Sequence, residues 1–330
     1  MSDKKRIEYI DVFKGIGILL MVIGHIGYGN IVRTLIYGYH MPMFFFISGY
    51  LYDKSKSKLK FKEYILKKVR TLIVPYYTFG LVYFVINSII ISKVDYAGLT
   101  HILYINTTGI PIESALWFLT AMFWMYLIIY FIEKINKKII KIFILSIISV
   151  LGLCGRRFIP FILPFAIEQS FVGILFFYFG IVLKKYIIIA YNKLRQISKT
   201  KNILILLANI CLYCILSIYN GAINMRLGVY NNIIIFLFAS IIAIITTLYI
   251  SVKIANKNNK ILYILKLIGE NSIVFVCFNH FVITIVNYLI SLGLHNVIIT
   301  RILDLPFVIA TLLVICEIFK NKHLKKVFGK

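Results

Sequence analysis

Residues 231–252 read NNIIIFLFASIIAIITTLYISV, a run of 22 residues without a charged side chain. A helix of about 20 mostly apolar residues spans the hydrocarbon core of a bilayer. Similar runs recur along the whole chain of 330 residues, which is 61% apolar and only 15% charged. Soluble globular proteins are about half apolar and about a quarter charged. The sequence therefore predicts a polytopic membrane protein, and it excludes a cytosolic enzyme, a disordered chain and a disulfide scaffold.

Ten apolar segments predict an all-α bundle of about ten transmembrane helices. Short loops join most of them, so we expect a single integral-membrane domain over residues 1–330, with no fused soluble domain. The segments are Tyr9–Gly27, Ile31–Leu51, Leu72–Ile91, Ala115–Ile132, Ile139–Leu153, Phe165–Leu183, Ile203–Tyr219, Asn231–Val252, Ser272–Leu292 and Val297–Phe319.

The positions of the lysines and arginines predict the orientation. The formal net charge of +25 alone would suggest a nucleic-acid partner. With the N-terminus inside, however, 30 of the 37 basic residues lie in cytoplasmic loops or tails, 6 lie on the outer side, and Lys14 lies within the first segment. The positive-inside rule describes this asymmetry. We therefore expect both termini to be cytoplasmic, in a multi-pass protein of the cell membrane with no nucleic-acid partner.

Cysteine usage predicts neither a metal site nor a redox centre. The five cysteines lie in or beside apolar segments without metal-ligand spacing. Cys211 and Cys214 form a C-x-x-C pair, but inside an apolar helix rather than after a strand. The richness of the chain in Ile, Lys and Asn is typical of a low-GC bacterium.

The first segment carries three ionisable residues, Asp11, Lys14 and His25. An ionisable group in hydrocarbon is costly unless it is paired or hydrated, so it marks a candidate functional site. Lys14 and His25 share nearly one helical face, ~16 Å apart along the axis, and Asp11 precedes Lys14 by one turn. The alternative is that Asp11 and Lys14 reach the inner headgroups and His25 the outer interface.

Three glycines, Gly15, Gly17 and Gly24, thin the same segment. Small residues allow neighbouring helices to approach closely within a membrane. We therefore expect close packing, or a ligand, against this helix.

Two further histidines lie within apolar segments. His40 lies near the middle of the second segment, and Pro42 predicts a bend there. His280 lies midway along the ninth segment. Each could bind a substrate or serve only as a hydrogen-bonded packing group.

The densest basic cluster lies between Asp53 and Arg70, and we expect it to form a loop. Part of it serves orientation and attraction to anionic lipid. Its end, Lys67-Lys68-Val69-Arg70, precedes Pro75 at the mouth of the third segment. Arg pairs phosphate bidentately and Lys binds it as a point charge, so this cluster could hold a phosphorylated cytosolic ligand.

These pieces together resemble the acyltransferase-3 family of integral-membrane acyltransferases, in particular its fucose 4-O-acetylase-like branch. The resemblance covers residues 6 to 320 and depends on the order of five motifs. They are Asp11, Lys14-Gly15 and His25; His40-Met41-Pro42 with Phe46-Ile47-Ser48-Gly49-Tyr50; Lys67-x-x-Arg70 before Pro75-Tyr76; Leu116-Trp117-Phe118-Leu119; and Gly269-Glu270-Asn271-Ser272-Ile273 with His280.

The resemblance implies transfer of an acyl group, usually acetyl from cytosolic acetyl-CoA as co-substrate, to a hydroxyl of a sugar or surface polysaccharide. The family's basic-x10-histidine motif maps onto Lys14 and His25, and its R-x-x-R motif onto Lys67 and Arg70. Lys replaces the commoner Arg at 14 and 67, which weakens any bidentate role. The Trp117 segment lacks the acidic residue that follows it in some branches.

Chemistry assigns roles to these positions. A sugar hydroxyl needs a base to take its proton, and His25 is the candidate because its ordinary pKa lies near neutrality. Asp11 or Lys14 would order the helix face or hold part of coenzyme A. Further candidates are Lys67, Lys68 and Arg70 for the coenzyme A phosphates, and His40, Trp117 and His280 for the acceptor.

Two interpretations remain open. Trp117 could belong to an interfacial aromatic belt instead of an acceptor cavity. The whole chain could be a transporter or exporter of glycan, with proton-relay histidines. Against the transporter, no paired broken helices are apparent in the sequence. Neither the acceptor glycan nor the oligomeric state follows from the residues.

Overall fold

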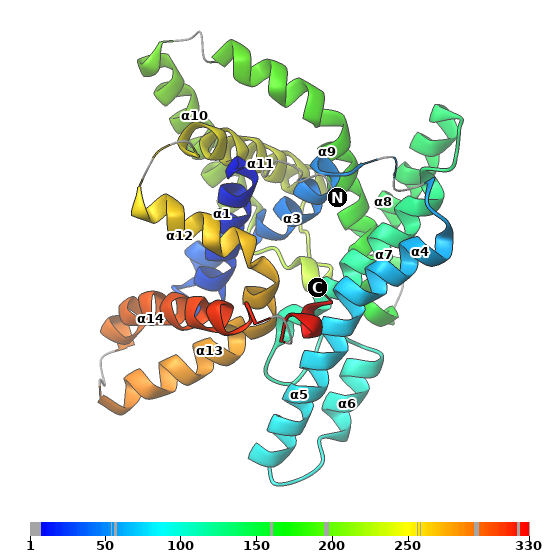
Figure 1. Ribbon diagram of the computed structural model, residues 1–330. Coiled ribbons are helices and arrows are strands. Elements are labelled where there is room, and N and C mark those ends of the chain that lie inside the picture. Colours follow the sequence, from blue (N-terminus) through cyan, green and yellow to red (C-terminus); the bar gives the residue numbers. More distant parts are fainter. Residues whose placement is uncertain are drawn as a thin grey trace. The chain divides into compact units, whose positions relative to one another are not determined.

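The computed structural model describes residues 8–53, 55, 58–158, 161–194, 198–255, 257, 259–293, 297–321 and 324–329. Within these ranges the regular elements are helices, apart from one isolated antiparallel bridge between Asn224 and Val229 (Figure 1). Nine of the described helices are long and apolar enough to cross a bilayer. The prediction of an all-α multi-span membrane protein is confirmed. The predicted cytoplasmic location of both termini concerns residues before Glu8 and Lys330, which lie outside the described residues.

The chain forms two compact units. The first contains Met1–Leu51, Phe179–Ile223 and Tyr230–Ser272, and the second contains Tyr52–Tyr178, Asn224–Val229 and Ile273–Lys330. Helix α9 (Ile167–Leu194) contributes to both, so neither unit is one continuous stretch of chain.

The first unit is built around α1 (Glu8–Ile26), a continuous helix as predicted. It packs along α12 (Lys260–Glu270) and beside α11 (Ile233–Ile254), which in turn packs on α10 (Lys199–Asn220). A Cβ atom on Gly15 would collide with the carbonyl of Leu265, and one on Gly269 with the carbonyl of Asp11. The expected close packing at the glycines of α1 is therefore confirmed.

The second predicted segment, Ile31–Leu51, is not one bent helix. It forms two short helices, α2 (Asn30–Tyr37) and α3 (His40–Tyr50), separated at Gly38 and Tyr39. The prediction of a bend at Pro42 was wrong. Pro42 lies in the first turn of α3, where a helix needs no N–H donor.

At the break, carbonyl groups that lack a helical N–H donor accept hydrogen bonds from side chains of other helices. Tyr213 of α10 donates its hydroxyl to the carbonyl of Leu35. Ser240 of α11 donates to the carbonyl of Gly38 at 2.7 Å. Freed backbone groups within a membrane require such partners, so the break depends on α10 and α11.

The second unit contains a long helical segment over residues 61–90. Helix α4 (Phe61–Lys68) passes through a π-helical turn (Val69–Ile73) into α5 (Val74–Ile90). The expected loop before the third segment is therefore wrong for residues 61–70, which are helical.

A second expected loop, between the eighth and ninth segments, likewise contains α12.

The remaining helices of the second unit surround this segment or follow it in the chain. Helix α6 packs on α5, and α7 packs on the π-helical turn. Their bounds are Tyr96–Leu103 for α6, Trp117–Ile132 for α7, Lys138–Phe158 for α8, Ser272–Gly293 for α13 and Val297–Ile318 for α14.

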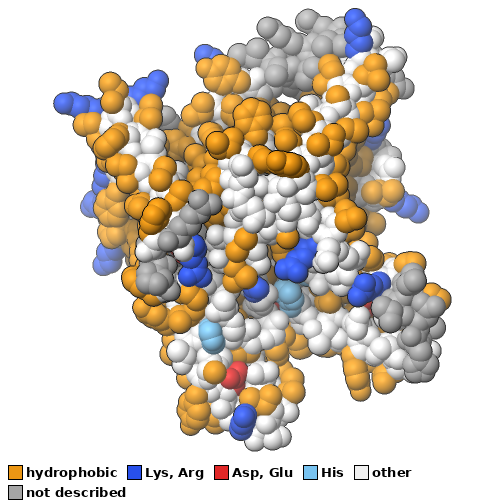
Figure 2. Space-filling view, turned by 180° about the vertical axis from the view of Figure 1, so that it is seen from behind, with side chains coloured by type: hydrophobic (Ala, Val, Ile, Leu, Met, Phe, Trp, Pro, Cys, Tyr) orange, Lys and Arg blue, Asp and Glu red, His pale blue; other side chains and the backbone are white. Residues whose placement is uncertain are grey.

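Many apolar side chains lie on the surface, and Figure 2 shows them spread over the face that it displays. On α10, for example, Leu204, Leu207, Ile215 and Ile218 are exposed. Large exposed apolar patches mark contact with a membrane or a partner. Together with the helix lengths, this surface indicates a lipid bilayer environment.

Candidate functional site

The N-terminal half of α1 carries an ion pair. Lys14 Nζ lies 3.0 Å from Asp11 Oδ1, and the two side chains are 24% and 8% exposed. Residues three apart lie on one helix face, so the pair forms within α1 itself. Glu8 extends the charged stripe by one turn and pairs with Lys266 of α12 at 2.5 Å.

His25 lies in the last turn of α1, and the first unit brings His40 near it. The ring of Tyr37 stands edge-on to His25 at 6.5 Å between centroids. The same ring lies 5.1 Å from that of His40. Tyr37 thus contacts both histidines, which come from two segments that the break at Gly38 brings together. His25 is partly exposed, whereas His40 is buried.

The hydrogen bond of His40 defines its tautomer. Its Nδ1 lies 2.9 Å from the carbonyl of Ile36, one of the carbonyls next to the break. Because a carbonyl only accepts, Nδ1 carries the proton, and Nε2 of the neutral ring is an acceptor. His40 therefore stabilises the break, and its Nε2 keeps the capacity to accept a hydroxyl proton.

The three basic residues lie at the π-helical turn of the second unit. Lys67 and Arg70 are exposed, and Lys68 stands over the ring of Tyr126 at 3.1 Å from its centroid. The hydroxyl of Thr71 donates to the carbonyl of Lys67 at 2.9 Å. A π-turn within an α-helix is frequent at functional sites. The geometry leaves the side chains of Lys67 and Arg70 accessible to an anionic ligand, and that of Lys68 held by an aromatic ring.

Trp117 is the first residue of α7 and is buried. Its carbonyl accepts a hydrogen bond from Thr120 Oγ1 at 2.8 Å, and that hydroxyl accepts one from Asn106 at 2.6 Å. A buried ring is not part of a lipid-exposed aromatic belt, so that alternative is wrong. Trp117 is instead packed at the start of α7, next to a polar loop.

A buried carboxylate that the sequence analysis missed lies four residues before Trp117. Glu113 is completely buried and caps the start of the helical segment from Ser114. Its Oε2 accepts the backbone N–H of His280 at 2.9 Å, and its Oε1 accepts from Asn279 at 3.2 Å. An acidic residue directly before an apolar run was the available signal, but its partners lie on α13, more than 160 residues away.

His280 meets a serine hydroxyl at the same place. Its Nε2 lies 3.0 Å from Ser114 Oγ, and both residues are partly exposed. The second unit thus brings together Glu113, Ser114, Asn279 and His280, of which the sequence analysis identified only His280.

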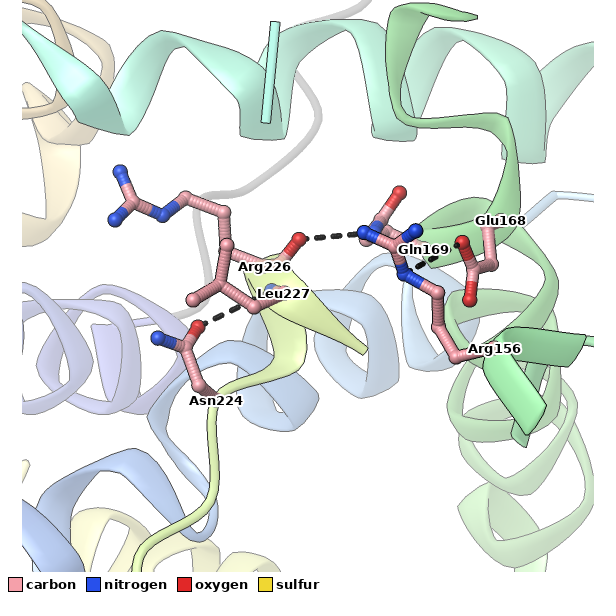
Figure 3. Close-up of polar contacts among 6 residues, drawn as sticks. All are labelled: Arg156, Glu168, Gln169, Asn224, Arg226 and Leu227. Carbon is pink, nitrogen blue, oxygen red and sulfur yellow. Dashed lines mark hydrogen bonds and ion pairs between the residues drawn. The ribbon is translucent and has the colours of Figure 1, made fainter. Parts of the chain in front are cut away.

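A further polar cluster of the second unit has a structural role (Figure 3). Arg156 pairs with Glu168 at 3.6 Å, and Gln169 donates to the carbonyl of Arg226 at 2.9 Å. Asn224 accepts the N–H of Leu227, which closes the same turn. The side chain of Arg226 points away from Arg156 (Figure 3). The contacts hold the turn around Arg226 against the start of α9.

The predicted site residues divide between the two units. The first unit holds Asp11, Lys14, His25 and His40, and the second holds Lys67, Lys68, Arg70, Trp117 and His280.

A multi-span helical membrane protein with ionisable groups inside its helices is the class that this fold defines. Residues 7–319 match the acyltransferase domain of acyltransferase family 3, so the chain belongs to that family and is a membrane acyltransferase. Comparison with curated proteins and with solved structures gives no match.

The family membership, rather than helix continuity, decides against the transporter. The sequence argument against it was that no paired broken helices are apparent. Among the described residues one predicted span is broken, at Gly38–Tyr39, whereas the junction of α12 and α13 at Asn271 lies between two predicted spans. One broken span is not a pair, so that argument stays a prediction, and the match over residues 7–319 is the finding that supports an acyltransferase.

Proposed function

We propose that the chain is a membrane O-acetyltransferase of the fucose 4-O-acetylase-like branch, acting as one domain in a bacterial cell membrane with both termini in the cytoplasm. It moves acetyl from cytosolic acetyl-CoA to a hydroxyl of a cell-surface polysaccharide, such as a capsule or exopolysaccharide, or of its sugar precursor. The family match over residues 7–319 is the observation that carries this proposal.

His25 is the general base for the acceptor hydroxyl. A positioned base typically contributes 10²–10⁴-fold to such a transfer. His25 is partly exposed at the end of α1, so a substrate hydroxyl can reach its ring. Asp11 and Lys14 order the same helix face, since their ion pair holds the charged side chains against α1.

Lys67 and Arg70 bind the phosphates of acetyl-CoA. Both side chains are exposed at the π-helical turn. Lys68 adds positive charge at the same place, although its ammonium group stands over the ring of Tyr126. His40, Trp117 and His280 belong to the acceptor side, where His40 Nε2 can accept a proton from a sugar hydroxyl.

Transfer of labelled acetyl tests this function directly. Membranes containing the protein are incubated with acetyl-CoA labelled in its acetyl group, and label in the isolated glycan is compared with membranes lacking the protein. We expect protein-dependent label that unlabelled acetyl-CoA competes away. Label that is equal in both membranes, across the glycans of the producing cell, would contradict the proposal.

A further inference from the structure

The hydroxyl of Ser114, which the proposed function does not use, forms a pair with the imidazole of His280. Ser114 Oγ lies 3.0 Å from His280 Nε2. A serine within hydrogen-bond reach of a base is the arrangement that activates a serine nucleophile. Both residues are partly exposed, so a substrate carbonyl can approach them.

Glu113 holds both sides of this pair in place. Its Oε2 accepts the backbone N–H of His280 at 2.9 Å. Its Oε1 accepts the backbone N–H of Ala115, the residue after Ser114, at 3.3 Å. One buried carboxyl group therefore fixes the backbone on the serine side and on the histidine side. A catalytic pair needs this rigid support to keep its geometry.

The loop before Ser114 contains unsatisfied polar groups. Asn106 and Thr107 are each only 1% exposed. Asn106 Oδ1 and Thr107 Oγ1 have no hydrogen-bond partner among the residues that the structure describes. Buried polar atoms normally have a partner, so these two oxygens suit donors on a bound molecule. The amide N–H groups of a pantetheine arm are donors of this kind.

Helix α5 leads from the basic residues of the π-helical turn toward the pair of Ser114 and His280. Tyr83 of α5 donates its hydroxyl to the carbonyl of Cys277 at 2.7 Å, one turn before His280 on α13. Arg70 and Tyr83 are 13 residues apart, or ~20 Å along a helix. This length is similar to the ~16 Å between Lys14 and His25 on α1. An arm held by its phosphates at Arg70 thus extends toward Ser114 within one unit.

We propose that Ser114 is a covalent acyl carrier and that His280 is its base. The inference rests on the proposed function, because the donor is the acyl thioester of that reaction. His280 Nε2 takes the proton of Ser114 Oγ while Oγ bonds to the acyl carbonyl carbon. The carbon–sulfur bond then breaks, and the coenzyme A thiolate leaves and takes a proton from water.

The acyl-serine ester is then the donor to the acceptor. The acceptor hydroxyl bonds to the acyl carbonyl carbon and gives its proton to the general base of the transfer. The bond from that carbon to Ser114 Oγ breaks, and Oγ recovers its proton from protonated His280. No oxidant, reductant or metal is required. The proposal thus assigns the acylation step to Ser114 and His280 of the second unit.

The test uses the full-length protein in membranes with labelled acetyl-CoA and no added acceptor. After an acid quench, mass spectrometry locates acetyl on the peptide containing Ser114. We expect acetyl there in the wild type and in Ser291→Ala, whose exposed hydroxyl donates to the carbonyl of Tyr288 on α13. We expect none in Ser114→Ala and about 100-fold less in His280→Gln. The variant His25→Ala should retain acyl-Ser114 while it loses glycan transfer.

The outcomes separate this inference from the proposed function. Two results together would overturn the acyl carrier and leave the acetyltransferase standing. Ser114→Ala would transfer acetyl to glycan within about twofold of the wild-type rate, and the wild type would carry no acetyl on Ser114. If the wild type transfers nothing, a fluorophosphonate probe decides. If the probe labels Ser114 and this labelling requires His280, the result supports Ser114 as a nucleophile that takes another acyl donor. If the probe does not label Ser114, the result overturns Ser114 as a nucleophile. Thermal unfolding of each variant confirms that it is folded.

Discussion

Lys14 Nζ lies 3.0 Å from Asp11 Oδ1 on the face of α1 that leads to His25. Both charges are mostly shielded from solvent, so neither can lose its partner without cost. The pair thereby fixes the side chains on the stripe where the sequence predicted a functional site. Its geometry supports a role in ordering this face, and its energetic coupling can be measured.

Replacing either member of the pair should destabilise the protein. We expect Asp11→Asn and Lys14→Met each to lower the free energy of unfolding by about 1–3 kcal/mol, because a shielded charge loses its partner. The double variant should lose less than the sum of the two. Unfolding in detergent measures all three. Strict additivity would show that the ion pair contributes nothing.

The α1–α12 contact predicts a difference between two glycine variants. In Gly269→Ala the new Cβ would collide with the carbonyl of Asp11, and backbone cannot rotate away, so we expect a loss of about 1–3 kcal/mol. Gly293 ends α13, and its added Cβ would meet no atom within 4 Å among the described residues other than its chain neighbours. Gly293→Ala should therefore be neutral, or stabilise by up to about 1 kcal/mol. Equal unfolding temperatures for the two variants would contradict the packing.

Hydropathy and glycine placement are local features of the sequence, and they predicted the long helices and a close approach to α1, but not that α12 is the helix that approaches it. The break at Gly38 did not follow from the sequence. Its carbonyl is satisfied by Ser240, 202 residues away. Hydropathy reports burial in lipid, and it does not report whether a helix continues.

The candidate site shows the same limit. The histidines were identified because an ionisable residue in an apolar run is conspicuous. Glu113 lies in a loop, and its burial depends on Asn279 and His280 of α13. No local pattern relates these residues.

The π-helical turn predicts a specific kinetic effect. Arg70→Ala and Lys67→Ala should each raise the KM for acetyl-CoA by about 10–100-fold, since each removes a charged hydrogen bond to phosphate. The kcat should change little because these groups bind the same charge before and during transfer. Lys93→Ala removes an exposed charge elsewhere in the second unit and is the control. A KM unchanged in Arg70→Ala would remove this residue from the donor site.

The carboxyl of Glu113, in the loop before α7, predicts a pH dependence of stability. Burial raises its pKa from 4.5 to about 8, although hydrogen bonds from His280 and Ala115 oppose the shift. A pKa raised on folding favours the protonated folded state, so its contribution is complete below pH 4.5 and is lost as pH rises through about 8.

Thermal unfolding between pH 5 and pH 9 checks this sign. The wild-type unfolding temperature should fall across the range, and Glu113→Gln should reduce the fall because an amide does not titrate there. A wild-type curve that rises more steeply than that of Glu113→Gln would contradict the direction.

The most direct test of the account compares acetyl transfer in the wild type, His25→Ala and the control His101→Ala, at matched expression. His101 lies in the second unit and bonds the carbonyl of Ile105. We expect His25→Ala to lose transfer by about 10²–10⁴-fold and His101→Ala to keep it. Transfer at the wild-type rate in His25→Ala would contradict the central claim that His25 is the base.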